Sequence, residues 1–328
     1  MQISQSTKLA VIGAGSWGTV IAYLLATNGH SVILWARRES LAWEINATKE
    51  NAHYVPGLKL PEKLLASSSL SKATEGVDAV VIAVPSHGLR SVLTELPDVP
   101  ALISASKGLE GGSFKRFTEV MAEYQSATLA ALSGPNLAAE IAVGKPTAAT
   151  LASADEAFAK KAQSWFNSER LRVYRSSDVT GVELAGAMKN VVALAAGMAD
   201  GLALGDNAKA TIMTRGLVEI VRLGTHLGGD PESFYGLAGL GDMVATCAGA
   251  KSRNHRAGSR IAKGDTLTQL KADKLTAEGI PTVKAVYDYA AVNQLELPIC
   301  TQVYNVIYEQ KSPQIAIQDL MRRPYTVE

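Results

Sequence analysis

The stretch from Leu9 to Gly29 limits the possible fold more than any other part of the sequence. It reads LAVIGAGSWGTVIAYLLATNG: an apolar run, glycines spaced G-x-G-x-x-G, then an apolar helical pattern. In a dinucleotide-binding turn, Gly13 permits a sharp bend, Gly15 lets the backbone approach a pyrophosphate, and Gly18 lets the helix pack closely on the strand. The phosphates then lie at the positive end of the helix. A glycine-rich surface loop is the alternative, but such loops rarely have a strand before them and a helix after them.

The length and composition fit a folded, globular chain. Its 328 residues are enough for two domains with separate cores. With 47% hydrophobic residues, 19% charged residues and a net charge of +1, neither disorder nor a nucleic-acid-binding surface is indicated.

The cysteines and the N-terminal sequence indicate a cytoplasmic protein. Cys247 and Cys300 are too few for a disulfide framework, and neither belongs to a C-x-x-C pair, which suits a reducing compartment. The opening MQISQSTKLAVIG has no apolar signal core. The apolar stretch Val191–Leu204 is interrupted by Asp200, so we expect it to fall short of a membrane span.

Short β-branched runs alternate with helical patterns through the first half of the chain. SVILWARR predicts a second strand ending at Trp35. Further strands are expected at Val77–Pro85, Ala101–Gly108, Thr128–Pro135 and Thr147–Ser153, and helices near Leu89–Glu95, Phe114–Tyr124 and Asp155–Asn167. Such alternation is typical of a parallel sheet with crossover helices. The sequence therefore predicts an α/β Rossmann-type N-terminal domain over residues 1–181.

The end of the second strand bears on the choice of cofactor. A site that prefers an unphosphorylated ribose usually has Asp or Glu here, whereas this chain has Arg37 and Arg38. Two guanidinium groups favour a 2′-phosphate and hence NADP(H). Glu39 follows at once and either weakens that preference or begins the next helix. Two solvated arginines at a strand end are the alternative interpretation.

Polar residues follow the carboxyl ends of three predicted strands. These are Ser86, Lys107 and Asn136, at the edge where open α/β sheets bind ligands. Lys107, in SASKGLE, either faces the reactive end of the cofactor or is an ordinary exposed lysine, and its spacing does not decide between the two.

From Val182 onward no convincing strand pattern follows, which predicts an all-α C-terminal domain over residues 182–328. The expected helix Val182–Leu204 is rich in Ala and Gly, so neighbouring backbones can approach it closely. Lys189, followed by Asn190, lies in this apolar surface. A lysine on a helix usually extends to water, but this one lies where the cofactor domain gives way to the second domain.

Two later segments carry the residue types of a phosphate site. Gly236–Gly258 combines glycines with Asp242, Thr246 and the cluster Ser252, Arg253 and Asn254. Such a segment either caps a helix or holds a phosphate. Leu275–Val286 then brings Glu278 and a Gly-Ile-Pro turn before an amphipathic helix.

Seven motifs together resemble one known family. GAGSWGT, SASKGLE, LSGPNLAAE, ELAGAMKNVVALAAG, GLAGLGDMVATC, KSRN and AEGIPT occur in the order and at roughly the distances found in bacterial NAD(P)-dependent glycerol-3-phosphate dehydrogenases. They cover nearly the whole chain. The resemblance implies a Rossmann-type domain followed by a helical domain. It also implies interconversion of sn-glycerol 3-phosphate and dihydroxyacetone phosphate with NADP(H) or NAD(H), which supplies the glycerophospholipid backbone.

The resemblance also implies roles for individual residues, with Lys189 as the catalytic lysine and Arg253 with Asn254 holding the substrate phosphate. The expected catalytic group is Lys189, Asp242, Lys107, Asn190 and Thr246. The expected cofactor-binding residues are Gly13, Gly15, Ser16, Trp17, Gly18, Arg37, Arg38, Lys107, Ala138, Arg253 and Glu278. The expected substrate-binding residues are Lys107, Gly134, Asn136, Lys189, Asp242, Ser252, Arg253 and Asn254.

Two positions depart from the commonest family pattern. Asn136 stands where Ser or Thr is frequent, which leaves its substrate contact open, and Pro281 stiffens the turn after EGI.

The chemistry of the residues agrees with the resemblance. Reduction of a ketone by a nicotinamide requires a held carbonyl, a positive donor at the developing oxyanion and a proton for the alkoxide. Lys189 can supply the last two. No zinc-binding spacing occurs among His30, His53, His87, His226 and His255, and no metal is expected.

Two other functions remain open. One is a related dehydrogenase acting on a hydroxyacid or on 6-phosphogluconate, and the other is a cofactor-sensing protein without catalysis. The SRN cluster and the GLGD segment favour the glycerol phosphate activity over the first, and the presence of Lys189 and Asp242 argues against the second. The sequence leaves the oligomeric state open, with a homodimer as one possibility.

Overall fold

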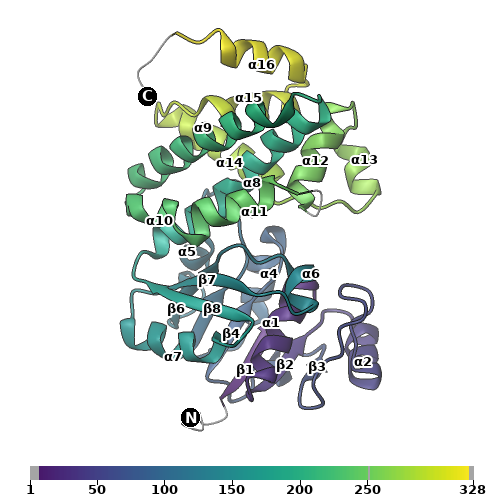
Figure 1. Cartoon of the computed structure of the whole chain (residues 1–328). Helices are drawn as coiled ribbons and strands as arrows, with labels where there is room; N and C mark the ends of the chain where they lie inside the picture. The colour runs from purple at the N-terminus through teal and green to yellow at the C-terminus, as the bar shows by residue number, and fades with distance from the viewer. Residues whose placement is uncertain (1–6, 250–251, 325–328) are drawn as a thin grey trace. The chain divides into compact units, whose positions relative to one another are not determined.

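The protein divides into two compact units. The structure, a computed structural model, describes residues 7–249 and 252–324 (Figure 1). The first unit contains the described residues up to Ser106 together with Phe117–Val182, and the second contains Lys107–Arg116 and the described residues from Glu183 on. The sequence placed one boundary between residues 181 and 182, beside the last of these junctions. It did not anticipate that the segment 107–116 would group with the second unit.

The first unit is built on an eight-stranded sheet with the order β3-β2-β1-β4-β5-β6-β7-β8. The strands are β1 (Lys8–Ile12), β2 (Ser31–Trp35), β3 (Leu65–Ser67), β4 (Ala79–Ile82), β5 (Ala101–Ser104), β6 (Thr128–Ser133), β7 (Thr147–Ala152) and β8 (Leu171–Ser176). All neighbouring strands run parallel except β6 and β7.

The antiparallel pair of β6 and β7 is a departure from the expected parallel pattern. The helix between them, α6 (Ala138–Ala142), has five residues and rises only about 7.5 Å. The six-residue β6 spans about 20 Å. Because α6 is too short to carry the chain back along the sheet, β7 returns in the opposite direction.

Helices cover both faces of this sheet. They are α1 (Ser16–Thr27), α2 (Glu39–Thr48), α3 (Leu70–Thr74), η1 (Ser86–Gly88), α4 (Leu89–Glu95), α5 (Phe117–Ala122), α6 and α7 (Glu156–Phe166). Alternate residues of β1 enter separate cores: Leu9 and Val11 pack with α1, α2 and α7, whereas Ala10 and Ile12 pack with α3, α4 and α5. The near-continuous apolar strands follow from burial on both faces.

Close backbone contacts explain two glycines of the turn between β1 and α1. Gly13 has φ +117°, and a Cβ there would lie 2.6 Å from the carbonyl oxygen of Ala83. A Cβ at Gly18 would lie 1.9 Å from the carbonyl oxygen of Gly13. A larger residue at Gly13 would clash with Ala83 after β4, and one at Gly18 would force α1 away from the turn.

The described residues of the second unit form helices joined by loops and no strand, as the sequence predicted. Its helices are α8 (Val179–Gly201, whose first turn precedes the junction), α9 (Gly205–His226), α10 (Pro231–Tyr235), the π-helical turn η2 (Leu237–Gly241), α11 (Asp242–Cys247), α12 (Arg253–Ala262), α13 (Leu267–Ala272), α14 (Gly279–Val292), α15 (Pro298–Tyr308) and α16 (Pro313–Met321). The sheet-containing first unit and this helical unit confirm the predicted fold class.

Helix α8 is the central helix of the second unit. A Cβ at Gly197 would lie 2.0 Å from the carbonyl oxygen of His255, and one at Gly258 would lie 2.0 Å from that of Leu194. These contacts confirm that small residues let α8 and α12 approach closely. By length and hydropathy alone α8 is apolar enough to cross a membrane, and its most apolar window is completely buried in the structure.

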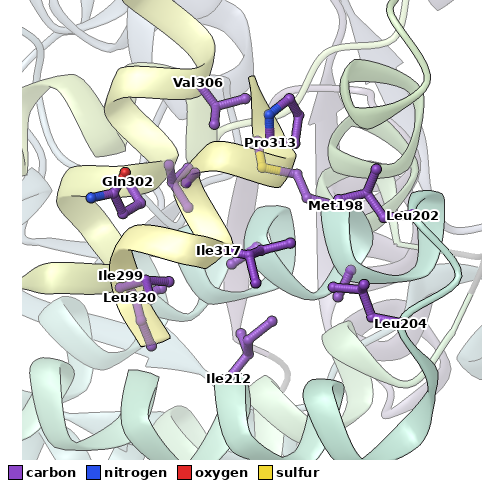
Figure 2. A pocket seen from close by; sticks show the side chains of 14 residues that line it. Met198, Leu202, Leu204, Ile212, Ile299, Gln302, Val306, Pro313, Ile317 and Leu320 are labelled. Carbon is purple, nitrogen blue, oxygen red and sulfur yellow. The ribbon is translucent and has the colours of Figure 1, made fainter. Parts of the chain in front are cut away.

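An apolar pocket of about 40 Å³ lies among α8, α9, α15 and α16 (Figure 2). Met198, Ile212 and Ile317 line it, and Gln302 is its polar residue. None of the residues predicted to bind cofactor or substrate lines this pocket.

Candidate functional site

The glycine-rich turn lies where the order of the sheet reverses. Strand β1 pairs with β2 on one side and with β4 on the other. In open α/β sheets this reversal leaves a crevice at the carboxyl ends of the strands, where ligands bind. The turn that follows β1 therefore faces the expected ligand position.

The start of α1 is suited to bind a pyrophosphate. A Cβ at Gly15, the residue before α1, would meet no atom within 4 Å, so there is open space in front of this backbone. No side chain caps α1, and its first turn holds no acidic residue. Its first N–H groups and positive helix end thus remain available to an anion, which fits NAD(P).

The side chains of Ser16 and Trp17 contact the protein backbone. The Ser16 hydroxyl donates to the carbonyl oxygen of Tyr54 at 2.9 Å, and the Trp17 indole N–H donates to that of Ala105 at 3.1 Å. Both side chains thus fix neighbouring loops around the glycine-rich turn. Their predicted cofactor contacts remain predictions.

Arg37 and Arg38 follow the carboxyl end of β2, and both are exposed. Neither guanidinium has a hydrogen-bond or ion-pair partner among residues 7–249 and 252–324. Two exposed cations at this strand end can bind a 2′-phosphate without first breaking an internal ion pair.

Residues after β6 form a second part of the predicted binding region in the first unit. Gly134 has φ +149°, and a Cβ there would lie 2.9 Å from the carbonyl oxygen of Ala148. Both amide atoms of Asn136 are buried without a hydrogen-bond partner. Ala138 begins α6. A buried amide with neither donor nor acceptor satisfied is unusual and suits a position that contacts a ligand.

The second unit brings four of the five predicted catalytic residues together around one carboxylate. Asp242 Oδ2 lies 2.6 Å from Lys107 Nζ, and Asp242 Oδ1 lies 3.2 Å from Lys189 Nζ. Lys189 Nζ also donates to Thr246 Oγ1 at 2.8 Å. Lys189, Asp242 and Thr246 are buried, with 7%, 2% and 3% exposure. Two lysines on one carboxylate leave a net positive charge where an oxyanion would be stabilised.

The glycine-rich segment before Asp242 places this carboxylate. Residues Leu237–Gly241 form the π-helical turn η2, which runs directly into α11. A Cβ at Gly239 would lie 2.0 Å from the carbonyl oxygen of Phe234, so only glycine fits there. Asp242 and Thr246 are four residues apart on α11 and therefore lie on the same helix face.

Burial and charge shift the pKa values of both central groups. Burial lowers the pKa of the Lys189 ammonium to about 8, an effect that the charge of Asp242 opposes and that of Lys107 reinforces. Burial raises the pKa of the Asp242 carboxyl, but the charges of Lys107 and Lys189 outweigh it and hold the pKa below its usual range. Lys189 can therefore gain or lose a proton near neutral pH beside a carboxylate that stays ionised.

Asn190, also predicted to be catalytic, bonds to a different partner. Its Oδ1 accepts from Asn254 Nδ2 at 2.7 Å, and Asn254 Oδ1 accepts from the Gly279 N–H at 2.9 Å. Both asparagines are buried. These two hydrogen bonds connect α8, at the residue after Lys189, to the first turns of α12 and α14.

The residues predicted to hold the phosphate begin α12. Ser252 caps this helix by accepting from the His255 N–H at 3.2 Å. Arg253 is exposed, and its Nη1 donates to Thr276 Oγ1 at 3.0 Å. Glu278 is half-buried and immediately precedes α14. A cationic side chain at a helix start suits a phosphate dianion.

Sequence reasoning missed a partly buried chain of polar contacts next to this helix start. His255 Nε2 lies 2.7 Å from Asp200 Oδ2, and Lys209 Nζ lies 2.9 Å from Asp200 Oδ1. The only hint of these contacts in the sequence was that His255 directly follows Asn254, a predicted substrate-binding residue. The pairing itself depends on the packing of α8, α9 and α12.

Comparisons with known proteins agree with this geometry. Two family models, the N-terminus and the C-terminus of NAD-dependent glycerol-3-phosphate dehydrogenase, match residues 8–159 and 178–318. The chain belongs to this family.

Relatives in the family align over nearly their whole length. Proteins named glycerol-3-phosphate dehydrogenase (NAD(P)+) from Citrifermentans bemidjiense and Streptomyces coelicolor are 44% and 45% identical to the chain, and each alignment covers 98% of both proteins. The crystal structure of the glycerol-3-phosphate dehydrogenase from Coxiella burnetii is 37% identical and has a TM-score of 0.91. It covers 97% of this chain and 99% of its own. The resemblance inferred from the seven motifs is confirmed.

Proposed function

We propose that the protein is an NAD(P)-dependent sn-glycerol-3-phosphate dehydrogenase that interconverts this substrate with dihydroxyacetone phosphate and so supplies the glycerophospholipid backbone. The observation that carries the proposal is the buried cluster of Lys107, Lys189 and Thr246 around Asp242, in a chain that matches the family along its length.

The proposed roles of the second unit follow from charge and burial. In ketone reduction, Lys189 donates a hydrogen bond to the developing oxyanion and then its proton, and in the reverse direction it accepts that proton. Asp242 holds the Lys189 ammonium in place, and its negative charge favours the protonated form of Lys189. Arg253 and Asn254 bind the phosphate. In this proposal residues 182–328 serve the substrate and residues 1–181 the cofactor.

The proposed cofactor contacts lie at the carboxyl edge of the sheet. When bound, NAD(P)H supplies the hydride. The N–H groups at the start of α1 bind the pyrophosphate, and Arg37 and Arg38 bind the 2′-phosphate, so NADP(H) is favoured.

A spectrophotometric assay tests the proposal. Purified protein is mixed with dihydroxyacetone phosphate and either NADPH or NADH, and absorbance of the reduced nicotinamide is followed. A panel with hydroxyacid precursors and with dihydroxyacetone serves as the control. Oxidation that depends on dihydroxyacetone phosphate is expected, whereas activity only on a different carbonyl compound would contradict the proposal.

Replacing Arg37 by alanine should change cofactor preference. A charge-assisted hydrogen bond to phosphate contributes about 1.5–3 kcal/mol, so we expect KM for NADPH to rise roughly ten- to a hundredfold, and KM for NADH far less. Steady-state kinetics with each cofactor measure this. An equal rise of KM for both cofactors would show that Arg37 does not bind the 2′-phosphate.

The activity should also depend on pH in opposite ways for the two directions. Because ketone reduction requires protonated Lys189, whose pKa is about 8, kcat/KM for reduction should fall as the pH rises through 8. For oxidation, which requires the neutral amine, kcat/KM should rise over the same range. Profiles measured from pH 7 to 10 give the result, and a reduction rate that stays flat to pH 10 would contradict it.

Location and partners form a further part of the proposal. Both cysteines are buried and unpaired, as suits the reducing cytoplasm. The proposed partner is the small-molecule substrate, with no nucleic acid and no membrane span. A homodimer is proposed as well, and analytical ultracentrifugation would test it.

A further inference from the structure

Asn51 lies under the glycine-rich turn, in the loop that follows α2, and it is fully buried at 0% exposure. Its Nδ2 donates to the carbonyl oxygen of Ala14 at 3.0 Å and to Thr19 Oγ1 at 2.8 Å. Ala14 precedes Gly15, and Thr19 lies one turn into α1. One amide group therefore holds both ends of the glycine-rich turn.

The contact with Ala14 fixes the direction of a specific N–H group. The carbonyl of Ala14 and the N–H of Gly15 belong to one planar trans peptide, so they point in opposite directions. Because Asn51 binds the carbonyl from the protein interior, the Gly15 N–H points away from the interior. A Cβ at Gly15 would meet no atom within 4 Å, and the Gly15 N–H has no partner among the described residues.

The loop that carries Asn51 is itself attached to the turn. The Asn51 carbonyl oxygen accepts from the N–H groups of Tyr54 at 3.1 Å and Val55 at 2.8 Å. The Tyr54 carbonyl oxygen accepts from the Ser16 hydroxyl at 2.9 Å. The buried Asn51 Oδ1 has no partner, so only the donor half of the amide is used. An aspartate here would place a carboxylate against the Ala14 carbonyl.

We propose that Asn51 is a positioning residue for cofactor binding, which orients the Ala14–Gly15 peptide so that its N–H meets the pyrophosphate. This inference rests on the proposed use of a dinucleotide cofactor. Asn51 acts on affinity for the pyrophosphate and takes no part in proton transfer.

Binding of NADPH to the Asn51→Ala and Asn51→Asp variants, measured by fluorescence without substrate, tests the proposal. We expect Kd for NADPH to rise about tenfold, as for one lost well-oriented hydrogen bond. Kd for adenosine 2′-phosphate, which lacks the pyrophosphate, should stay within about twofold. A merely structural role would weaken both ligands or neither, and either result would overturn the proposal.

Asn46→Ala is the matched control, because Asn46 also makes two hydrogen bonds to a backbone, but at Ala66 rather than at the turn. Its Kd for NADPH should equal that of the wild type. Thr19→Val, which removes the second acceptor and keeps the Ala14 contact, should lower thermal stability with little change in Kd.

Amide hydrogen exchange of the wild-type protein keeps the proposal testable should the Asn51 variants not fold. The Gly15 amide hydrogen should exchange rapidly in the cofactor-free protein and slowly when NADPH is bound. Rapid exchange in both states would overturn the proposal. Because these measurements need no turnover, NADPH binding without reduction of dihydroxyacetone phosphate would refute the proposed function alone.

Discussion

Replacing Lys189 by methionine should lower kcat for dihydroxyacetone phosphate reduction by at least about 10²–10⁴-fold. General acid–base catalysis typically supplies this much, and loss of the positive donor at the oxyanion adds to the deficit. Methionine keeps the length and apolar stem of the side chain. Asp242 would still pair with Lys107 at 2.6 Å, so the variant should fold. Stopped-flow or steady-state assays at saturating cofactor measure the loss.

Lys284→Met is a matched control for the lysine substitution. Lys284 lies on α14 and forms an exposed ion pair with Asp288 at 3.0 Å, a kind of pair that contributes little to stability. The kcat of the Lys284→Met variant should equal that of the wild type. NADPH affinity of Lys189→Met should be unchanged, and retention of more than about a tenth of the turnover would rule out the proton-transfer role.

Replacing Arg253 by alanine should raise KM for dihydroxyacetone phosphate by roughly ten- to a hundredfold, because a charge-assisted hydrogen bond to the phosphate is lost. Arg253→Lys keeps the charge but not the planar fork, so it should recover only part of the loss. Arg253 is exposed and bonds only to Thr276 among the described residues, and the variants should therefore stay folded.

The comparison with dihydroxyacetone identifies what Arg253 recognises. This substrate lacks the phosphate, so its weak turnover should be nearly the same in the wild type and in Arg253→Ala. Arg256→Ala, at an exposed position one turn further along α12, is the control. If Arg253→Ala impaired both substrates equally, Arg253 would not be the phosphate clamp.

The sequence predicted the elements that depend on local patterns. The run from Leu9 through Gly18 predicted a strand, turn and helix, and one of its glycines, Gly18, is required by a close contact with the Gly13 carbonyl within that same segment. The Ala- and Gly-rich pattern of α8 likewise predicted close packing. Helix α4 begins and ends at the predicted residues, Leu89 and Glu95.

Features that depend on contacts between distant segments could not be predicted in this way. Strand β3 has three residues, too few for a periodic pattern. The use of Asn51 under the glycine-rich turn depends on how the loop after α2 folds back. The bond between Asn190 and Asn254 also joins residues that are 64 positions apart, so no local pattern predicts it, and the catalytic role of Asn190 stays a prediction.

Lys107 belongs to a ten-residue segment that packs with the second unit, although the residues on both sides of it belong to the first. The two units are therefore not exchangeable as modules by a single crossover in the gene. A chimera joined at residue 181 would take Lys107 from one parent and Asp242 from the other. Relatives that exchange cofactor-binding units can keep this ion pair only if residues 107–116 suit the new helical unit. The segment 107–116 thus has to match the helical unit, although it is encoded between two stretches of the first unit.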